Sequence, residues 1–292
     1  MGRKIAILMD SSCSVPDEFV GEDIYVVPMY VHLKDKSYKD ILEISSRQLK
    51  EKIEKEDIIA KTSIPSIGDI KEYIEKIKTD GYTDIIAISV SSGLSGLYNA
   101  FNMAASDEKD INIKVFDTKN VAFSSAFFAL YTQELIKEKK NITLDEIYDE
   151  LNNNIKDSKL FICLDTLKYL IAGGRVGKVA GSLGTLLKIM PIITCDDDGV
   201  YETVGKVRSI EKATIDICTR IKEFVEAKAK ESKKNIYLAL VYRDDDKVLK
   251  KMEDLLRNEI SSAVKYIKCE LTTPTVGVHS GFGVMAVGAF CF

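Results

Sequence analysis

The first half of the chain alternates short apolar runs with longer amphipathic segments. The apolar runs are continuous stretches of Ile, Val, Leu and Ala bounded by turn residues, and they predict buried strands at residues 4–10, 24–31, 84–90 and 111–117. Between them, apolar residues recur at three- and four-residue spacing, which predicts helices at residues 45–56, 66–79, 94–105 and 121–139. This alternation indicates a parallel sheet covered by helices, a three-layer α/β domain.

The pattern changes near residue 157, after a polar helix that ends in Asn152-Asn153-Asn154. The second half combines strands predicted at residues 160–164, 191–195, 236–242, 264–271 and 284–290 with long helices at 210–230 and 247–259. The segment Asp196-Asp197-Asp198-Gly199 is typical of a hairpin turn, so this sheet is predicted to be mixed. We expect two α/β domains, at residues 1–158 and 159–292, with a ligand between or near them.

Local chemistry supports some of these boundaries. Ser14 and Ser66 each stand three residues before a carboxylate, Asp17 and Asp69, which predicts a capped helix start at both places. Polar residues also follow the predicted strands, and ligands of doubly wound sheets bind outside the carboxyl ends of strands. The segments Asp10-Ser11-Ser12, Ser91-Ser92-Gly93 and Asp117-Thr118 are therefore expected along one edge of the sheet.

Composition narrows the function classes. The 41 basic and 45 acidic residues leave a small negative charge, which argues against binding a nucleic acid duplex. No apolar run reaches the ~20 residues of a membrane span and no cleavage signal follows Arg3-Lys4, so a cytoplasmic protein is expected; transient contact with a membrane surface is compatible with this. Six dispersed cysteines and two histidines predict neither structural disulfides nor a metal centre.

Two hydroxyl-rich segments predict an anion site. They are Lys61-Thr62-Ser63-Ile64-Pro65-Ser66 and Ser91-Ser92-Gly93-Leu94-Ser95-Gly96, and each is expected after a strand and before a helix. A helix start has unpaired N–H groups and carries roughly +0.5 of an elementary charge, which favours a carboxylate or phosphate. The glycines in Gly277-Val278-His279-Ser280-Gly281-Phe282-Gly283 would let a ligand approach the imidazole of His279. We therefore expect these three segments to share one site.

Other chemistry remains open or is disfavoured. An acyl ester hydrolase using Ser92 or Ser95 with His279 is the main alternative, although residues 93–96 lack the G-x-S-x-G spacing. A binding module for a phosphorylated small molecule is a further alternative function. The segment from Gly173 to Val179 is not a phosphate loop, because Ala172 stands where Walker A has glycine and Val179 where it has Ser or Thr.

Taken together, these motifs resemble those of the DegV family over nearly the whole chain. The resemblance runs through Met9-Asp10-Ser11-Ser12, residues 25–29, residues 61–66, residues 91–96, residues 164–170 with Gly173-Gly174-Arg175, and Val278-His279-Ser280-Gly281. It implies a two-domain α/β protein that binds a long-chain fatty acid between its halves, without a cofactor or catalytic residues of its own. It also implies that a separate ATP-dependent kinase subunit converts the presented carboxylate to an acyl phosphate, as in bacterial fatty acid kinase.

The resemblance further implies roles for individual residues. By motif position, Thr62, Ser92 and His279 would bind the carboxylate. The surroundings of that site would come from Ser63, Ser91, Gly93 and Ser280. Arg175 and Arg208 fall where the family has basic residues suited to head-group electrostatics or to docking the kinase.

One departure from the family pattern follows the predicted strand at residues 111–117. The family often has a Ser and a Gly-x-Gly after the strand ending in Asp117-Thr118, whereas this chain has Ala122, Ser124 and Ala126, followed by Phe127 and Phe128. We predict a changed tunnel shape or chain-length preference.

Overall fold

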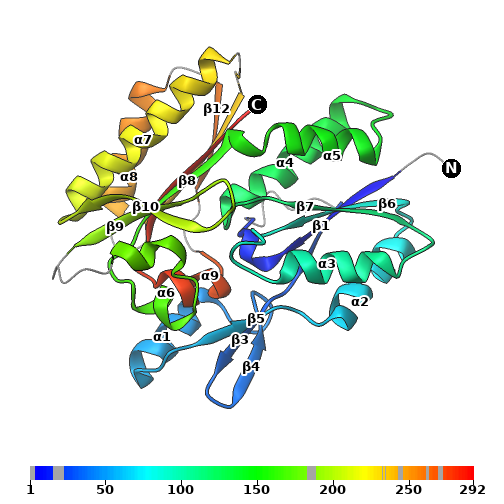
Figure 1. Cartoon of the computed structure of the whole chain (residues 1–292), viewed down its shortest axis with the longest axis horizontal. Coiled ribbons are helices and arrows are strands. Elements are labelled where there is room, and N and C mark those ends of the chain that lie inside the picture. The colour runs from blue at the N-terminus through cyan, green and yellow to red at the C-terminus, as the bar shows by residue number, and fades with distance from the viewer. Residues whose placement is uncertain are drawn as a thin grey trace.

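The computed structural model describes residues 4–15, 23–182, 189–231, 233, 235–242, 246–260, 263–268 and 272–292. Its first sheet has the order β2-β1-β6-β7 and is entirely parallel. The strands are β1 (Ile5–Asp10), β2 (Ile24–Val27), β6 (Asp84–Ser89) and β7 (Asn112–Asp117). The helices are α2 (Ile67–Thr79) and α3 (Leu97–Ser106) on one face, and α4 (Phe123–Glu138) and α5 (Leu144–Asn153) on the other (Figure 1). The predicted three-layer arrangement is therefore confirmed.

The predicted single strand at residues 24–31 is wrong. β2 ends at Val27, and the chain then enters a separate antiparallel sheet with the order β4-β3-β5. This small sheet consists of β3 (Tyr30–Leu33), β4 (Lys36–Lys39) and β5 (Lys61–Ser63). Pro28 has no N–H for a sheet hydrogen bond, so the apolar run is divided between two sheets. Residues 61–63, expected to follow a strand, form one themselves: Thr62 pairs with Val31.

The second large sheet has the order β10-β9-β8-β13-β11-β12 and is mixed, as predicted. Only β11 and β12 pair in parallel among its described strands. The strands are β8 (Ser158–Cys163), β9 (Met190–Cys195), β10 (Tyr201–Val207), β11 (Asn235–Tyr242), β12 (Ala263–Lys268) and β13 (Met285–Cys291). The predicted hairpin joins β9 to β10, with Gly199 at a φ of 75°. The last part of the predicted strand at 264–271 lies outside the described residues.

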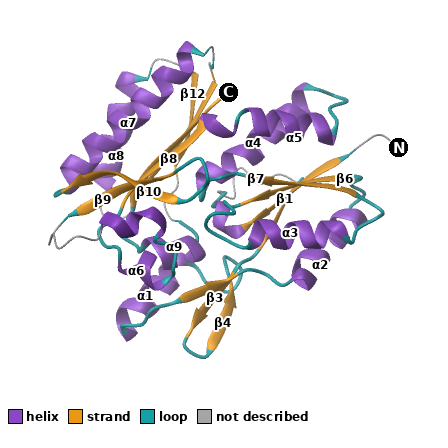
Figure 2. Cartoon of the chain, viewed as in Figure 1, coloured by secondary structure: helices purple, strands orange, loops and turns teal. Residues whose placement is uncertain are grey.

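Helix α4 lies between the two large sheets (Figure 2). It contacts β1 and β6 of the first sheet and β8, β11 and β13 of the second, and eleven of its sixteen residues are buried. A helix buried on all sides fits this position between two apolar faces. The outer face of the second sheet is covered by α7 (Ile210–Lys230) and α8 (Asp246–Glu259). Because α4 joins both sheets in one core, the domain boundary near residue 158 stays a prediction.

A short C-terminal helix packs against the N-terminal half of the chain. Helix α9 (Pro274–Ser280) contacts β3, β5 and α1 (Ser46–Glu56) of that half, and α6 (Lys168–Ala172) packs beside it. Val278 and Phe282 share a small core with Val31 and Leu49. This packing brings residues more than 200 positions apart in sequence to one place, since Thr62 meets His279 there.

Buried carboxylates fix the surroundings of α9. The Asp40 carboxylate accepts hydrogen bonds from Ser11 Oγ at 2.6 Å and from the Thr275 N–H at 3.2 Å. Asp40 therefore ties the turn after β1 (residues 11–13) to the first turn of α9. Burial raises the pKa of Asp40, although its hydrogen bonds with Ser11 and Thr275 act in the opposite direction.

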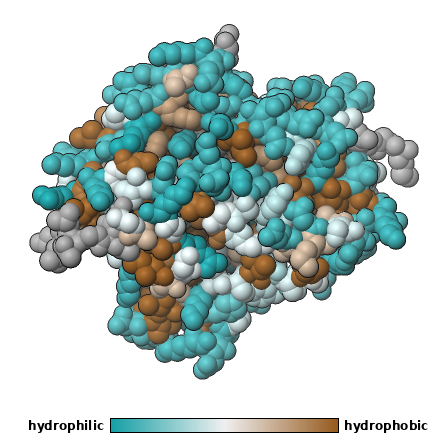
Figure 3. Space-filling model, in the orientation of Figure 1, coloured by the Kyte–Doolittle hydropathy of each residue, from teal (hydrophilic) through white to brown (hydrophobic). Residues whose placement is uncertain are grey.

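One predicted helix cap is confirmed, and one lies partly outside the described residues. Ser66 Oγ accepts from the Asp69 N–H at 3.0 Å, and Asp69 Oδ2 accepts from the Ser66 N–H at 2.9 Å. Asp17, the partner expected for Ser14, is not among the described residues. The face in Figure 3 is mostly hydrophilic, with apolar side chains gathered over α1 and α6. In the described part of the chain, no helix has both the length and the apolar character to cross a membrane.

Candidate functional site

A pocket lies between the two halves of the chain. It encloses about 800 Å³ of space free of atoms, its mouth included, and its wall is mostly aliphatic. The first half of the chain contributes Ser12, Met29, Thr62, Val90, Leu94, Ser95, Val121, Ala122 and Phe123. The second contributes Leu160, Ile162, Leu164, Leu170, Arg175, Ile193, Tyr201, Thr272, Thr275, Val276, His279, Ser280, Val284 and Ala286. A mostly apolar cavity with a few convergent polar groups is typical of a small-molecule site.

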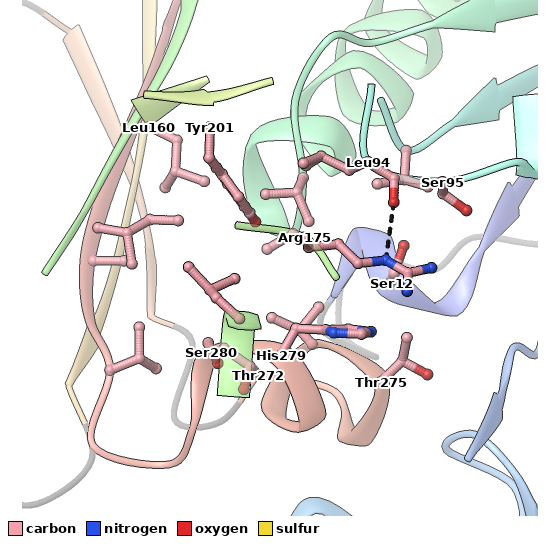
Figure 4. A pocket seen from close by; sticks show the side chains of 18 of the residues that line it. Ser12, Leu94, Ser95, Leu160, Arg175, Tyr201, Thr272, Thr275, His279 and Ser280 are labelled. Atoms are coloured by element: carbon pink, nitrogen blue, oxygen red, sulfur yellow. Dashed lines mark hydrogen bonds between the residues drawn. The ribbon is translucent and has the colours of Figure 1, made fainter. Parts of the chain in front are cut away.

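The polar groups are unevenly placed. Ser12, Ser95, Arg175, Thr275 and His279 lie on one side, while Leu160 lies on the opposite side (Figure 4). We call these five residues, together with Thr62, the polar end of the pocket. The opposite, strand-built surface consists of Leu160, Ile162, Leu164, Ile193, Val284 and Ala286, and we call it the apolar wall.

The pair Thr62 and His279 is the centre of the polar end. Thr62 Oγ1 lies 2.8 Å from His279 Nε2, and His279 Nδ1 is buried without a hydrogen-bond partner among the described residues. Gly173 makes room for the imidazole, because a Cβ there would lie only 2.2 Å from Nδ1. Burial, with a further contribution from the nearby Arg175 charge, lowers the pKa of His279 to about 4, so the ring is neutral at pH 7.

Arg175 is the single cation among the described residues that line the pocket. Its Nε donates to the carbonyl of Leu94 at 3.3 Å, as drawn in Figure 4, and its Nη1 donates to the carbonyl of Gly173. These two carbonyls hold the guanidinium at the polar end, since an arginine fork is fixed by more than one acceptor. Arg175 therefore lines the pocket, and its role in head-group electrostatics stays a prediction.

Hydroxyl groups complete the polar end. Thr275 Oγ1 is buried and, like His279 Nδ1, has no partner among the described residues. The Ser12 hydroxyl and N–H both donate to the buried carboxylate of Asp10, which also accepts from the Val90 N–H at 3.0 Å. Burial raises the pKa of Asp10, against the effect of these hydrogen bonds. Asp10 therefore fixes the turn that presents Ser12.

The segment at residues 91–96 contributes Ser95, whereas Ser92 lies outside the pocket lining. Ser92 is exposed, and its hydroxyl accepts from Lys119 Nζ at 3.1 Å. Ser91 instead donates to the carbonyl of Gly199 at 2.8 Å, so it ties this segment to the β9–β10 hairpin. Gly93 is needed for the same contact, because a Cβ there would lie 2.7 Å from the Gly199 carbonyl oxygen.

Of the remaining expected site residues, Ser280 lines the pocket, whereas Ser63 and Arg208 do not. Ser280 lines the pocket and donates to the carbonyl of Gly281 at 2.8 Å. Ser63 pairs with His32 Nε2 at 2.9 Å instead, because neighbouring residues of a strand face opposite sides. Arg208 is exposed just before α7 and is not a lining residue.

Sequence reasoning missed Thr275 and Ser12 as site residues. Thr275 follows Thr273-Pro274, and a proline one position after a Thr is a signal for a helix start. That signal would have predicted α9 and placed His279 on a helix. Ser12 stood in a segment expected at the sheet edge, but its distance from the other site residues along the chain concealed the connection.

The geometry does not assemble a hydrolase. His279 Nε2 meets a threonine rather than Ser92 or Ser95, and its Nδ1 has no carboxylate to orient it among the described residues. A nucleophilic serine requires a base that is itself oriented by a third group. No cluster of three or more His, Cys, Asp or Glu suited to a metal ion occurs in the described residues either.

The segment that departs from the family pattern also reaches the pocket. Ala122 adopts a φ of 54° and a ψ of −143°, a strained conformation for a residue with a Cβ, and it lines the pocket together with Phe123. Phe127 and Phe128 are fully buried and lie outside the lining.

Comparison with known proteins decides the family. The family model described as "Uncharacterised protein, DegV family" matches residues 4–291. The chain belongs to the DegV family. A DegV domain-containing protein of Clostridium acetobutylicum is 34% identical over 288 residues, 98% of each chain.

Solved DegV structures share the fold. "DegV, a fatty acid binding protein" from Bacillus subtilis is 26% identical, with a TM-score of 0.85 over 100% of both chains. A "degv lipid binding protein" from Thermotoga maritima is 25% identical, with a TM-score of 0.80 over 99% of both chains. These likenesses confirm the predicted α/β fold of the DegV type.

Proposed function

We propose that this DegV protein binds a long-chain fatty acid, with the carboxylate at the polar end of the pocket and the acyl chain along the apolar wall. The observation that carries the proposal is a mostly aliphatic cavity in which two buried polar atoms, His279 Nδ1 and Thr275 Oγ1, have no partner among the described residues. Buried polar groups are normally paired, so these atoms indicate a ligand with hydrogen-bonding oxygens. The description of the Bacillus subtilis relative as a fatty acid binding protein supports the same class of ligand.

The pairing of Thr62 with His279 suits an anionic acceptor. If the Thr62 hydroxyl donates to Nε2, the neutral ring carries its proton on Nδ1 and retains a free donor. If Nε2–H donates to Thr62 instead, the threonine hydroxyl is free to donate. Either arrangement supplies one donor to a carboxylate, and Arg175 supplies the positive charge. We assign a further hydroxyl to Ser95, in place of the Ser92 expected from the motif.

Affinity and orientation come from different parts of the ligand. Each buried methylene contributes ~0.8 kcal/mol, so a sixteen-carbon chain gains on the order of 12 kcal/mol before association and ordering costs. A carboxylate is expensive to bury unless several donors satisfy it. The acyl chain therefore supplies the affinity, and the polar end fixes which way round the acid binds.

Native mass spectrometry of protein purified from a bacterial host tests this proposal. We expect a retained adduct of fatty-acid mass, reduced in occupancy by His279→Ala and Thr62→Val. His32→Ala is a matched control, since His32 pairs with Ser37 and Ser63 away from the pocket lining. A phosphate-bearing adduct, or turnover of acyl esters without retention, would contradict the proposal.

We further propose that the bound acid is presented to a separate ATP-dependent kinase subunit, which converts its carboxylate to an acyl phosphate, and that this chain acts as the carrier. The family resemblance of its motifs supports this role. Arg208 is exposed beside the start of α7 and is available to a partner.

Charge reversal tests the carrier role. Arg208→Glu is expected to leave fatty-acid binding intact and to slow acyl phosphate formation with the kinase subunit and ATP. Lys230→Glu is the control, because it reverses an exposed charge at the other end of α7, about 30 Å away. Equal turnover by the two variants would count against a docking role for Arg208.

A further inference from the structure

The apolar wall leads away from the polar end along two neighbouring strands. In the pairing of β8 with β13, Ile162 lies opposite Ala286 and Leu160 lies opposite Gly288. Leu160 and Ile162 of β8 line the pocket together with Leu164, the residue after the strand, and four residues of extended chain span about 13 Å. Figure 4 shows Leu160 on the side of the pocket away from His279. Gly288, which is paired with Leu160, therefore marks the far end of the wall.

Phe123 lines the pocket and lies against Gly288 at that far end. It is the first residue of α4, it lines the pocket, and it is 2% exposed. A Cβ on Gly288 would lie 2.6 Å from Cε2 of Phe123, so only a glycine leaves room for the ring against the strand. The ring is thus seated on the sheet where the row of aliphatic lining residues ends.

Other aromatic rings pack behind the Phe123 ring. Phe127 lies one helical turn further, with its ring centroid 6.2 Å from that of Phe123, and it stacks on Phe290 and Tyr237. Phe290 is two residues beyond Gly288 on β13 and is fully buried. An acyl chain that reaches Phe123 therefore meets close-packed aromatic rings.

We propose that Phe123, seated on Gly288, is the stop that sets the longest acyl chain this protein accepts. The inference rests on the proposed fatty-acid binding and specifies its ligand: straight chains that end at the Phe123 ring. Below the limit, each added methylene raises affinity about four-fold; above it, the terminal carbons must displace a packed ring and affinity falls.

A chain-length series tests the stop. The full chain is freed of bound lipid and titrated with saturated straight-chain acids of increasing length, in wild type, Phe123→Leu and Phe123→Ala. We expect the longest tolerated acid to lengthen by a few carbons in Phe123→Ala and by fewer in Phe123→Leu. Phe123→Leu keeps most of the buried volume and therefore serves if the alanine variant does not fold.

Phe127→Leu is the matched control, because Phe127 is in the same helix and equally buried but does not line the pocket. The longest acid that Phe127→Leu binds should be the same as for wild type. An unchanged limit in both Phe123 variants, or an equal shift in Phe127→Leu, would overturn the stop while leaving fatty-acid binding in place. Failure of wild type to bind any acid of the series would instead overturn the proposed function itself.

Discussion

The two ends of the pocket are built in different ways. The apolar wall comes from alternate positions of adjacent strands, such as Ile162 beside Ala286, so strand geometry alone places its side chains. The polar end combines a strand of the small sheet, a loop before α3, the segment after α6 and helix α9, and its central pair joins residues 217 positions apart. The wall is thus a product of local pattern, and the polar end a product of long-range packing.

This difference has an energetic consequence. A substitution in the apolar wall changes the contact area. Its free-energy cost increases with the volume removed, because neighbouring aliphatic residues relax only partly around the gap. A substitution at the polar end leaves a buried donor or acceptor unpaired, and its effect follows the desolvation of that group. We therefore expect the largest effects at the polar end and the smallest beside the far end of the wall.

The largest effect is expected from pH. His279 has a pKa of about 4 in the folded chain and about 6.5 when unfolded, so between these values the unfolded state binds more protons. The stability of the ligand-free protein should therefore fall as pH drops from 6.5 to 4, by up to about 3 kcal/mol from this group. Denaturant unfolding between pH 6.5 and 4, in wild type and in His279→Gln, measures this loss of stability.

The variant isolates the contribution of the imidazole. Asp10 and Asp40 have raised pKa values, so they bind protons more readily in the folded state and oppose the loss as pH falls, equally in both proteins. The difference between the two proteins should thus reflect His279. Parallel pH profiles would show that the imidazole is not held neutral by burial.

Gly173→Ala should disrupt the polar end without changing any of its side chains. The new Cβ would lie 2.2 Å from Nδ1 and 2.7 Å from Cε1 of His279, so the imidazole must move away from Thr62. We expect fatty-acid affinity to fall by about 2 kcal/mol, roughly 30-fold, in a binding titration. Gly181→Ala is the control, since nothing in the described part of the chain, its own sequence neighbours aside, lies within 4 Å of its Cβ position. Equal affinities would mean that the imidazole position is unimportant.

Ser95→Ala and Ser92→Ala should differ although the residues are three positions apart. Ser95 lines the pocket, whereas the Ser92 hydroxyl is exposed beside Lys119. Loss of one hydrogen bond predicts that Ser95→Ala weakens fatty-acid binding by about 1 kcal/mol, and Ser92→Ala is expected to leave it unchanged. If Ser92→Ala weakened binding in the same titration and Ser95→Ala did not, Ser92 would be the residue that binds the carboxylate.

The smallest effect is expected beside the far end of the wall, at Ala122. Its φ of 54° is strained for alanine and free for glycine. Relief of strain should exceed the entropy lost by glycine, so Ala122→Gly is expected to raise the free energy of unfolding by about 1 kcal/mol or less. Ala126→Gly, inside the same helix, should instead lower it by about 1 kcal/mol. Destabilisation by both variants would show that Ala122 carries no strain.

Much of the fold was predictable from the sequence because its signals are local. Continuous apolar runs marked the strands of both large sheets, and Ser66 with Asp69 marked the start of α2. Pro28 is a signal that a strand ends, but the apolar residues on both sides of it favoured the prediction of one continuous strand. Helix α9 was missed because its seven residues are too few to show a helical repeat.

The site was predictable only in part. The motifs named Thr62 and His279, and the structure brings those two side chains into contact. They also named Ser63, Ser91 and Ser92, whose hydroxyls turn to His32, to Gly199 and to Lys119. Which of several adjacent hydroxyls enters a pocket depends on strand facing and loop path, and a motif does not encode these.

The sequence by itself determined the parallel sheet, the mixed sheet with its hairpin, and the residue types of an anion site, since each follows from periodicity or from local hydrogen bonding. The tertiary structure alone decided that α4 lies between the sheets, that α9 returns to the small sheet, and that Phe123 lies against Gly288 in the pocket lining. The physical reason is that these arrangements depend on burying surfaces far apart in the chain, and that burial is settled only when the elements pack together.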